Sequence, residues 1–500
     1  MPKAIKTIDS TSVNMKIEDK AMDLARRRGF IWGPSPNIYH GGVSGFYDWG
    51  PLGKLLKNKI ENIIRKGFIF HGFWEVECPT IMPSKVWEAS GHLEGFVDPV
   101  IRCKKCNSAF RVDSLIQENY PNEKVDGLTF TQLKKLIEKK KIKCPSCKGG
   151  LGEVESYNLM MRTTIGLNQE AYLRPETATT TYLLFPEYHR FFRTKMPFGV
   201  FQIGKAYRNE ISPRQGVFRT REFTQAEGQL FVLKEHFSKF DKFDDEKRTI
   251  LPLLPFGKKQ TKVTLQDAIK KKFIKKKVYG WTLAAAYDII KKIGFPENKI
   301  RIRQHNPKEL AHYAEDAWDI EIKTERYGWF EICGVHDRKD YDLKRHAEYS
   351  KSKFAVQGEV PTIMEIAFGI ERPTYCLLEE SLREDKERDW LFFPPGVAPI
   401  DVAVFPLIKK DNLPKLAKEV FEGLDKEFVC TYDESGSIGR RYRRMDEVGT
   451  TLCITIDHDS LKDKTVTLRE VSTMKQIRVN ITDLKDTVRN ILYGSLKFGK

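Results

Sequence analysis

Two strand-like stretches in the middle of the 500-residue chain constrain its fold most. FQIGKAYRNE (201–210) and VFRTREFTQAE (217–227) are separated by ISPRQG, whose proline and glycine mark a loop, so the segment predicts an antiparallel hairpin. Side chains alternate between the two faces of a strand. Arg208 and Glu210 are therefore expected on one face of the first strand. One face of the second strand would carry Arg219, Arg221, Phe223, Gln225 and Glu227. Such a face does not suit a hydrophobic core.

The same face suits a nucleotide. Guanidinium groups bind phosphates in a bidentate manner. A phenyl ring can stack on a base, and a glutamate can accept a hydrogen bond from an exocyclic amine or bind an ammonium group. The alternative is a solvent-exposed ladder of ion pairs.

Three further fragments carry side chains of the same kind. RPETATTTY (174–182) puts an arginine and a glutamate beside a helix start, and GWFEICGVHDRKDYDL (328–343) puts Glu331 on a strand. MEIAFGIERPTYCLLEES (364–381) runs from an apolar strand through Gly369 and Arg372 into a helix. Each fragment alone is a weak signal, because a buried glutamate can simply be ion-paired.

Two Cys-x-x-Cys pairs, CKKC (103–106) and CPSC (144–147), indicate a metal site in residues 100–150. Each pair supplies two thiolates from a tight turn, and four sulfurs complete a tetrahedral zinc shell. The predicted ligands are Cys103, Cys106, Cys144 and Cys147. A closed four-sulfur site is structural rather than catalytic. The alternative is four ordinary reduced thiols.

The charge balance points to a polyanionic partner. Lys and Arg outnumber Asp and Glu by 85 to 68, a net charge of +17, which favours nucleic acid over other partners. A generally lysine-rich composition is the alternative. The sequence has neither an apolar run long enough for a transmembrane helix nor the features of a signal or transit peptide, so we expect a cytoplasmic protein without a membrane partner.

Periodicity outlines the remaining organisation. LGKLLKNKIENIIRK (52–66) predicts a helix with one apolar face, followed by a strand that ends near Pro79, and this unit fits either plain core or a subunit interface. Residues 235–310 resemble an insertion whose lysine runs favour a solvated face over a binding site. From about residue 396, alternating strands and helices predict a small α/β domain. No G-x-G-x-x-G follows its first strand, so a dinucleotide is not expected there.

Taken together, these fragments resemble the class II aminoacyl-tRNA synthetases, and most closely the homodimeric glycyl-tRNA synthetases. The first class motif is similar to residues 52–79, the second to the YRNE…REF hairpin, and the third to GIER and its helix; RPETA, REFTQAE and GWFEICGVHDR add the glycine-specific pattern. The C-terminal domain is similar to an anticodon-binding domain. The resemblance covers nearly the whole chain from about residue 20.

The resemblance implies an α+β fold with an antiparallel catalytic sheet of six or seven strands flanked by helices. The implied domains are a catalytic domain over 1–99 and 151–395, a zinc-binding insertion over 100–150, a second insertion over 235–310, and an anticodon-binding domain over 396–500. It further implies a homodimer that activates glycine with ATP and Mg²⁺ and transfers it to the 3′ end of tRNA(Gly).

The resemblance also assigns roles to single residues. Arg208 would hold the α-phosphate and Arg372 the γ-phosphate, and both are expected to be catalytic. Glu210 would contact the adenine amine, Phe223 would stack on adenine, and Glu331 would meet ATP or its magnesium. The remaining ATP-binding residues implied are Asn209, Phe218, Arg219, Thr220, Arg221, Ile332 and Gly369. The glycine-binding residues implied are Arg111, Glu176, Phe223, Gln225, Glu227, Glu365 and Ala367, with the three glutamates receiving the ammonium group.

The chain departs from the family pattern in two places, at three residues. Ile366 and Ala367 follow Glu365 where the family usually has proline and serine, and Thr179 stands where it usually has glutamine. Both changes touch the amino-acid pocket, so reaction class is better specified than substrate. Two alternatives remain at this level: a non-catalytic synthetase-like binding protein, such as a polymerase accessory subunit, and a synthetase for proline, threonine or serine. The phosphate-binding arginines speak against the first, and the acid-rich pocket speaks against the second.

Overall fold

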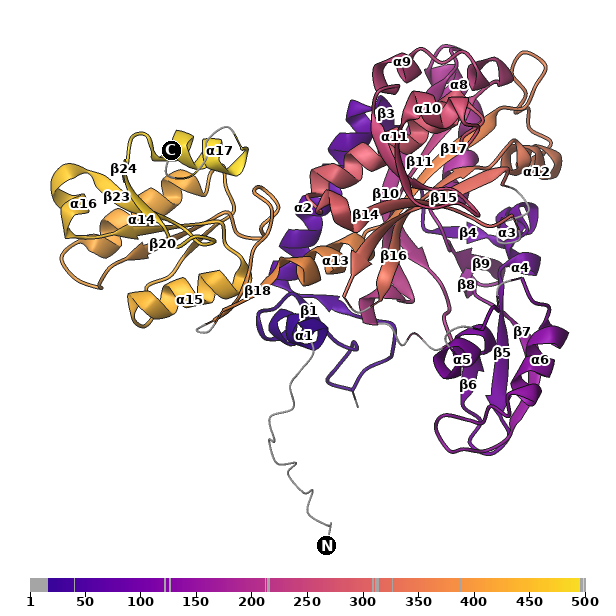
Figure 1. Cartoon of the computed structure of the whole chain (residues 1–500), viewed down its shortest axis with the longest axis horizontal. Coiled ribbons are helices and arrows are strands. Elements are labelled where there is room, and N and C mark those ends of the chain that lie inside the picture. The colour runs from indigo at the N-terminus through magenta and orange to yellow at the C-terminus, as the bar shows by residue number, and fades with distance from the viewer. Residues whose placement is uncertain are drawn as a thin grey trace, which may run out of the picture.

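The computed structural model describes residues 17–498 except 40, 121–122, 126, 212, 214–215, 308–309, 311–313, 326, 386–387 and 495–497. A large unit built on one long sheet is followed by a smaller C-terminal unit (Figure 1). Among the described residues, no helix combines the length and the apolar character that crossing a bilayer requires.

Nine strands form the main sheet, in the order β13-β12-β14-β15-β16-β17-β11-β10-β3. Neighbouring strands are antiparallel except for the pairs β12–β14 and β10–β3, which are parallel. The bounds are β3 Phe73–Glu75, β10 Phe198–Tyr207, β11 Glu222–Val232, β12 Ile250–Leu254, β13 Thr261–Thr264, β14 Ile300–Gln304, β15 Asp316–Thr324, β16 Gly328–Asp337 and β17 Thr362–Gly369.

The predicted hairpin is confirmed. Strands β10 and β11 pair antiparallel, with Gln202 opposite Glu227 and Ala206 opposite Phe223. The strands are as long as predicted but lie farther from the loop, because β10 spans Phe198–Tyr207 and β11 spans Glu222–Val232. Arg208, Glu210, Arg219 and Arg221 therefore lie in the connection beyond the strand ends, next to the short 3₁₀ helix η1 (Gly216–Phe218).

The sheet has two or three strands more than the six or seven expected. The additional strands β12, β13 and β14 come from the segment predicted as a second insertion, and they extend the sheet at one edge. The other six strands alone match the expected core. The predicted domain boundaries themselves stay predictions.

Three helices cover one face of the sheet: α2 (Pro51–Phe70), α11 (Lys277–Ile293) and α13 (Glu371–Ser381). The predicted apolar helix 52–66 is confirmed within α2, where Leu56, Ile60 and Ile64 are fully buried. Side chains from α2, α11 and alternate positions of the central strands form the largest hydrophobic core.

The opposite face is only partly covered. Helices α7 (Ala178–Tyr182), α8 (Phe185–Phe191) and α12 (Tyr341–Ser350) pack on one end of it through a second apolar cluster. The middle of this face, where β11, β16 and β17 run side by side, is left open to a cavity.

The region predicted to bind zinc has its own sheet, β6-β5-β7, and its own core. Its elements are β5 Val97–Cys103, β6 Ala109–Arg111, α5 Val112–Asn119, α6 Phe130–Lys139 and β7 Leu151–Asn158. The large unit contains a second three-stranded sheet, β4-β9-β8. The elements that complete the large unit are α1 Ile17–Arg27, β1 Ile31–Trp32, β2 Asp48–Trp49, β4 Ile81–Pro83, α3 Ser84–Ser90, α4 His92–Gly95, β8 Met161–Ile165, β9 Gln169–Leu173, η2 Lys234–Phe237, α9 Lys242–Glu246, α10 Leu265–Lys270, η3 Glu297–Lys299, β18 Leu382–Glu384 and β19 Asp389–Leu391.

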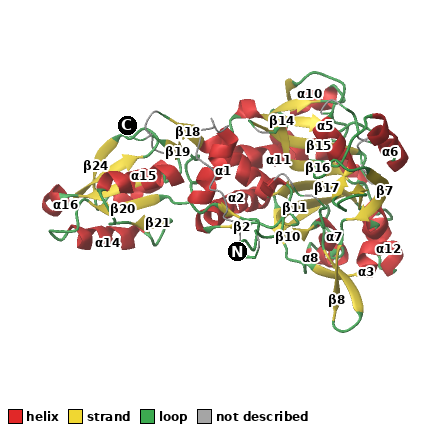
Figure 2. Ribbon diagram, turned by 90° about the horizontal axis from the view of Figure 1, so that it is seen from below, coloured by secondary structure: helices red, strands yellow, loops and turns green. Residues whose placement is uncertain are grey.

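The C-terminal unit is a five-stranded mixed sheet in the order β21-β20-β22-β23-β24, with helices on both sides. Figure 2 shows α14 and α15 on opposite sides of this sheet, and each packs on its own apolar cluster. The predicted strands and helices are confirmed, and one short helix, α16, was not predicted. The bounds are β20 Val402–Pro406, α14 Leu413–Leu424, β21 Cys430–Tyr432, α15 Ile438–Val448, β22 Leu452–Ile456, α16 His458–Asp463, β23 Thr465–Glu470, β24 Gln476–Asn480 and α17 Leu484–Leu492.

Candidate active site

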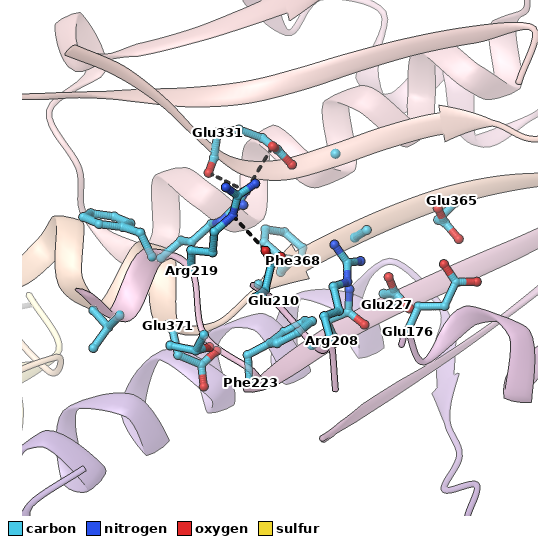
Figure 3. Close-up of a pocket in the computed structure, with 18 of the residues that line it drawn as sticks. Glu176, Arg208, Glu210, Arg219, Phe223, Glu227, Glu331, Glu365, Phe368 and Glu371 are labelled. Carbon is cyan, nitrogen blue, oxygen red and sulfur yellow. Dashed lines mark hydrogen bonds and ion pairs between the residues drawn. The ribbon is translucent and has the colours of Figure 1, made fainter. Parts of the chain in front are cut away.

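A charged cavity of about 270 Å³ lies on the open face of the main sheet (Figure 3). Strands β11, β16 and β17 supply its floor, and the ends of the β10–β11 connection supply one wall. Its charged lining consists of Glu176, Glu210, Glu227, Glu331, Glu365, Glu371, Arg208, Arg219, Arg338 and Arg372.

Arg208 lies near the middle of this lining. Its Nε atom donates a hydrogen bond to the carbonyl oxygen of Pro175 at 3.2 Å. Its guanidinium group lies 5.3 Å from the ring centroids of both Phe96 and Phe223. These contacts hold the arginine in place before any ligand binds. In Figure 3 it separates Glu210 and Arg219 from Glu176, Glu227 and Glu365.

On one side of Arg208, arginines and glutamates are paired. Arg219 lies 3.4 Å from Glu210, and Arg372 lies 3.0 Å from Glu331. Arg372 also donates to the backbone oxygen of Glu331 at 3.2 Å. Phosphates can take the place of these carboxylates on the arginines, and the freed carboxylates can then hold an amine or a metal ion.

On the other side of Arg208, three glutamates come together. Glu227 Oε2 accepts hydrogen bonds from the Thr177 hydroxyl at 2.5 Å and the Ala178 backbone N–H at 2.6 Å. Glu176 Oε1 accepts from the Thr179 hydroxyl at 2.7 Å. This places Thr179, the departure from the family pattern, directly on a carboxylate of the cavity.

The three carboxyl groups have different pKa values. Burial, together with the negative charges of Glu365 and Glu176, raises the pKa of Glu227 to about 8. Burial also opposes ionisation of Glu365, but Arg338 and His336 lower its pKa to about 2. For Glu176, burial is outweighed by His92, which lies 3.7 Å away, and by Arg338, so its pKa falls well below the ordinary value. At neutral pH two of the three are ionised and Glu227 carries a proton.

Glu365 is the most thoroughly bonded of the three. Its Oε1 atom accepts from His336 Nδ1 at 3.0 Å and from Arg338 at 3.2 Å, and its Oε2 atom accepts from the Tyr182 hydroxyl at 2.9 Å. Arg338 is held in turn by Asp342, at 2.9 and 3.0 Å. Glu365 is thereby fixed as a buried negative charge at the base of the cavity.

Two buried networks position the lining. Lys57 on α2 donates to Glu371 at 2.6 Å and to the Thr224 hydroxyl at 2.7 Å, and Glu371 accepts the Thr224 backbone N–H at 3.0 Å. Arg174, the arginine of RPETA, donates to the backbone oxygens of Lys205 at 2.7 Å and Cys78 at 3.0 Å. Arg174 is therefore a buried brace for the segment that carries Glu176.

The cavity brings together most of the residues expected from the sequence. These are Glu176, Arg208, Glu210, Phe218, Arg219, Thr220, Phe223, Gln225, Glu227, Glu331, Glu365, Ala367, Gly369 and Arg372.

Four expected residues lie outside that lining. Asn209 donates to the Tyr157 hydroxyl at 2.7 Å, and Arg221 donates to the backbone oxygens of Glu210 at 2.8 Å and Ser44 at 2.7 Å. Ile332 is buried in the main core. Arg111 is paired with Asp113 at 2.7 Å and Asp98 at 3.1 Å. Burial lowers the pKa of Arg111, but Asp113, Asp98 and Glu210 outweigh it and raise that pKa above its ordinary value.

Sequence reasoning missed three ionisable side chains of the cavity lining, namely His336, Arg338 and Glu371. All three lie inside fragments that had been singled out, GVHDR and GIER. Alternation along β16 from Gly334 could have placed His336 on the cavity face. However, a bulge between Ile320 and Glu321 shifts the pairing of β15 with β16, and no sequence pattern predicts this bulge.

The predicted cysteine cluster is formed. The Sγ atoms of Cys103, Cys106, Cys144 and Cys147 all lie within 4.8 Å of one another. The closest pairs are 3.5 Å and 3.6 Å apart. A tetrahedral zinc with Zn–S bonds of about 2.3 Å requires sulfurs about 3.8 Å apart, so the four thiols fit such an ion.

Family models match both units of the chain. The tRNA synthetase class II core domain (G, H, P, S and T) matches residues 162–381, and the anticodon binding domain matches residues 401–491. Two solved structures from Cryptosporidium parvum share the fold. A prolyl-tRNA synthetase has a TM-score of 0.58 at 14% identity, covering 95% of this chain and 77% of that one. The RNA binding domain of a threonyl-tRNA synthetase has a TM-score of 0.60 at 17% identity, covering 94% and 97%.

The fold and the cavity thus define a class II aminoacyl-tRNA synthetase. Curated relatives narrow the family further. The glycine–tRNA ligase of Methanocaldococcus jannaschii is 40% identical over 95% of this chain and 99% of its own length. That of Pyrococcus abyssi is 41% identical over 95% of this chain and 98% of its own length. The chain belongs to the glycine–tRNA ligase family.

Proposed function

We propose that the chain activates glycine with ATP and transfers the glycyl group to the 3′ end of tRNA(Gly). One observation carries the proposal: a single cavity has paired arginines and glutamates on one side, three glutamates on the other, and Arg208 between them. ATP suits the first side, because guanidinium groups bind phosphate oxygens. Glycine suits the second, because an amino acid without a side chain can be held only by its ammonium and carboxylate groups.

We assign the ATP side as follows. Phe223 stacks on the adenine, and Glu210 accepts a hydrogen bond from its amine. Arg219 binds the triphosphate and Arg372 binds its γ end, so both leave the glutamates with which they are paired in the free protein. Glu331, released by Arg372, would then hold the Mg²⁺ that accompanies ATP and neutralises phosphate charge.

Arg208 acts at the reacting atoms. The glycine carboxylate attacks the α-phosphorus, the bond to the β-phosphate bridging oxygen breaks, and pyrophosphate leaves. The attacking group is already an anion, so the step requires no general base from the protein. Negative charge increases on the α-phosphate oxygens, and a guanidinium held by Pro175 and two aromatic rings stabilises it without rearrangement.

On the glycine side, Glu227 and Glu176 receive the ammonium group. Glu227 Oε2 is bonded to the Thr177 hydroxyl and the Ala178 N–H, whereas Glu176 Oε1 is bonded to Thr179 and its Oε2 lies 3.7 Å from His92. Glu365 contributes mainly its fixed negative charge, because its oxygens are already bonded to His336, Arg338 and Tyr182. Gln225 and Ala367 line the same part of the cavity.

Amino-acid-dependent ATP–pyrophosphate exchange tests this function. Glycine should support exchange, and alanine, serine, proline and threonine should not. Exchange that requires another amino acid would contradict the substrate, and the absence of exchange with any amino acid would contradict adenylate formation.

We further propose that the C-terminal unit contacts the tRNA anticodon through exposed cations of α15. Arg440 and Arg443 are exposed on this helix. Arg441 on the same helix is buried, and it donates to the Gly436 backbone oxygen at 3.1 Å. Replacing Arg440 and Arg443 with serine should weaken tRNA aminoacylation and leave pyrophosphate exchange unchanged. The matched control is Lys462→Ser on α16, and an equal loss with the control would contradict the assignment.

The chain also carries a surface suited to a homodimer. Three aromatic side chains are exposed there: Phe70 at the end of α2 (74%), Trp74 on β3 (57%) and Phe191 on α8 (64%). The ring centroids of Trp74 and Phe191 are 5.6 Å apart. β3 is an edge strand of the main sheet. Exposed apolar patches of this kind commonly mark interfaces. Phe70→Asp should convert a dimer to a monomer in light scattering, whereas Phe256→Asp, at an exposed phenylalanine outside this patch, should not. An active wild-type monomer at assay concentration would contradict the dimer.

We also propose that the four cysteines hold a structural zinc ion and that the protein is located in the cytoplasm.

A further inference from the structure

His336 occupies an unusual place on the cavity floor. It lies on β16, where it lines the cavity together with Gly334, two residues earlier on the same face of the strand. A Cβ atom added to Gly334 would lie 2.6 Å from His336 Cε1 and 2.9 Å from Nε2. The imidazole ring therefore lies directly over Gly334, and only a residue without a side chain leaves room for it.

The ring is fixed from two further directions. Its Nδ1 atom is 3.0 Å from Glu365 Oε1, and because Glu365 is an acceptor, Nδ1 carries the proton. The ring of His305 stands nearly perpendicular to it, with centroids 6.3 Å apart, and His305 is itself paired with Asp319 at 2.8 Å. His336 cannot turn away from Gly334 without losing its bond to Glu365.

The neighbours on the cavity floor are small. Gly334 is paired across the sheet with Ala367, the position where the family usually has serine. Gly334 offers no side chain and Ala367 offers one methyl group, so the imidazole supplies the bulk on this part of the floor. Without the ring, a hollow would remain next to the glutamates.

We propose that His336 is a specificity-determining residue for the amino acid, with its ring filling the space that the side chain of a larger substrate would need. This inference rests on the proposed function. The ring also positions Glu365 through Nδ1, so His336 has two separable effects: it holds a carboxylate, and it limits the volume of the pocket.

Two substitutions separate these effects. His336→Ala removes both the ring and the hydrogen bond. His336→Asn removes the ring, but its side-chain amide can still donate to Glu365 from close to the position of Nδ1. The measured quantity is the ratio of kcat/KM for glycine to kcat/KM for alanine in pyrophosphate exchange. His236→Ala, at a histidine outside this cavity, is the matched control.

We expect the glycine-to-alanine ratio to fall about 10-fold or more in both variants, because the steric exclusion of one extra methylene discriminates by about 10- to 200-fold where it has been measured in apolar pockets. His336→Ala should also raise the KM for glycine, and His336→Asn should restore that KM toward the wild-type value without restoring the ratio. A wild-type ratio in His336→Ala, or in His336→Asn if the alanine variant does not fold, would overturn the inference. If the ratio is unchanged while the wild type still supports exchange with glycine, only this inference fails and the proposed function stands. A wild type that is inactive with glycine would overturn both.

Discussion

Lys57 and Glu371 form a buried ion pair, with 2.6 Å between Nζ and Oε1 and with both side chains at most 5% exposed. The pair joins α2, on the covered face of the sheet, to the first residue of α13, and Glu371 reaches the cavity lining. The scaffold beneath the cavity thus depends on a charge pair in a dry environment.

Removing one partner should be strongly destabilising. Lys57→Met leaves Glu371 buried without its counter-charge, and breaking such a pair typically costs about 3–5 kcal/mol. We expect a marked drop in the thermal midpoint, measured by calorimetry. The matched control is Lys54→Met on the same helix, because Lys54 is half exposed and lies 3.5 Å from Glu61. The double variant Lys57→Met/Glu371→Gln should regain part of the loss, and equal midpoints for Lys57→Met and Lys54→Met would show that the pair is unimportant.

The raised pKa of Glu227 predicts that glycine binding depends on pH. Below a pKa of about 8, Glu227 is mostly protonated in the free protein, and a glycine ammonium group binds better to the carboxylate. The KM for glycine should therefore fall as pH rises from about 6.5 to about 8.5, by up to about 10-fold per pH unit below the pKa, and binding should release a proton. Calorimetry in buffers of different ionisation enthalpy would measure that proton. In Glu227→Gln the KM for glycine should be higher and lose this pH dependence; a pH-independent KM in the wild type would contradict the assignment.

The same shift has a consequence for stability. A carboxyl group whose pKa is raised by folding favours the folded state when protonated, so its contribution decreases as pH rises from about 4.5 to about 8. Glu227→Gln should therefore raise the thermal midpoint of the free protein near pH 8 and change it little near pH 5. A glutamine oxygen can still accept from Thr177 and Ala178. A midpoint that is lower in the variant at both pH values would contradict this reasoning.

Metal removal tests the cysteine cluster. The purified protein should contain about one zinc ion per chain, and Cys144→Ser should lose it. Because the cluster closes a small core of its own, chelation should increase hydrogen exchange in residues 100–150 before it does so in the main sheet. Cys430→Ser, at a cysteine in the C-terminal unit, is the control and should keep its zinc. A metal-free wild type with the same exchange pattern would contradict the site.

The parts of the fold that could be predicted are those that short-range sequence patterns specify. The hairpin around ISPRQG, the helix of residues 52–66 and the alternating elements after residue 396 all have short-range signals, and the cysteine spacing needs no tertiary information. The short helix α16 also had a signal that was missed, because Asp457 caps it by accepting the backbone N–H of Ser460.

The remaining features depend on pairing between distant segments. Strands β12 to β14 join the main sheet by tertiary contact, and nothing within residues 250–304 marks them as its extension. Arg441 and Arg174 look like surface or ligand cations in the sequence, yet both are buried and bonded to backbone oxygens. Alternation could place His336 on the cavity face, but the position of its ring over Gly334 and its bond to Glu365 follow only from the tertiary structure. The sequence gives the residue types, but it does not show which of several arginine side chains will be buried.

The central claim is that Arg208 joins the ATP and glycine sides of one cavity, and glycine-dependent ATP–pyrophosphate exchange of its variants tests that claim most directly. By analogy with the loss of one oxyanion donor, Arg208→Ala should lower kcat about 10²- to 10³-fold. Arg208→Lys should fail to restore it, because an ammonium group lacks the planar fork that binds two phosphate oxygens. Retention of near-wild-type exchange by Arg208→Ala, in a folded protein, would contradict the account.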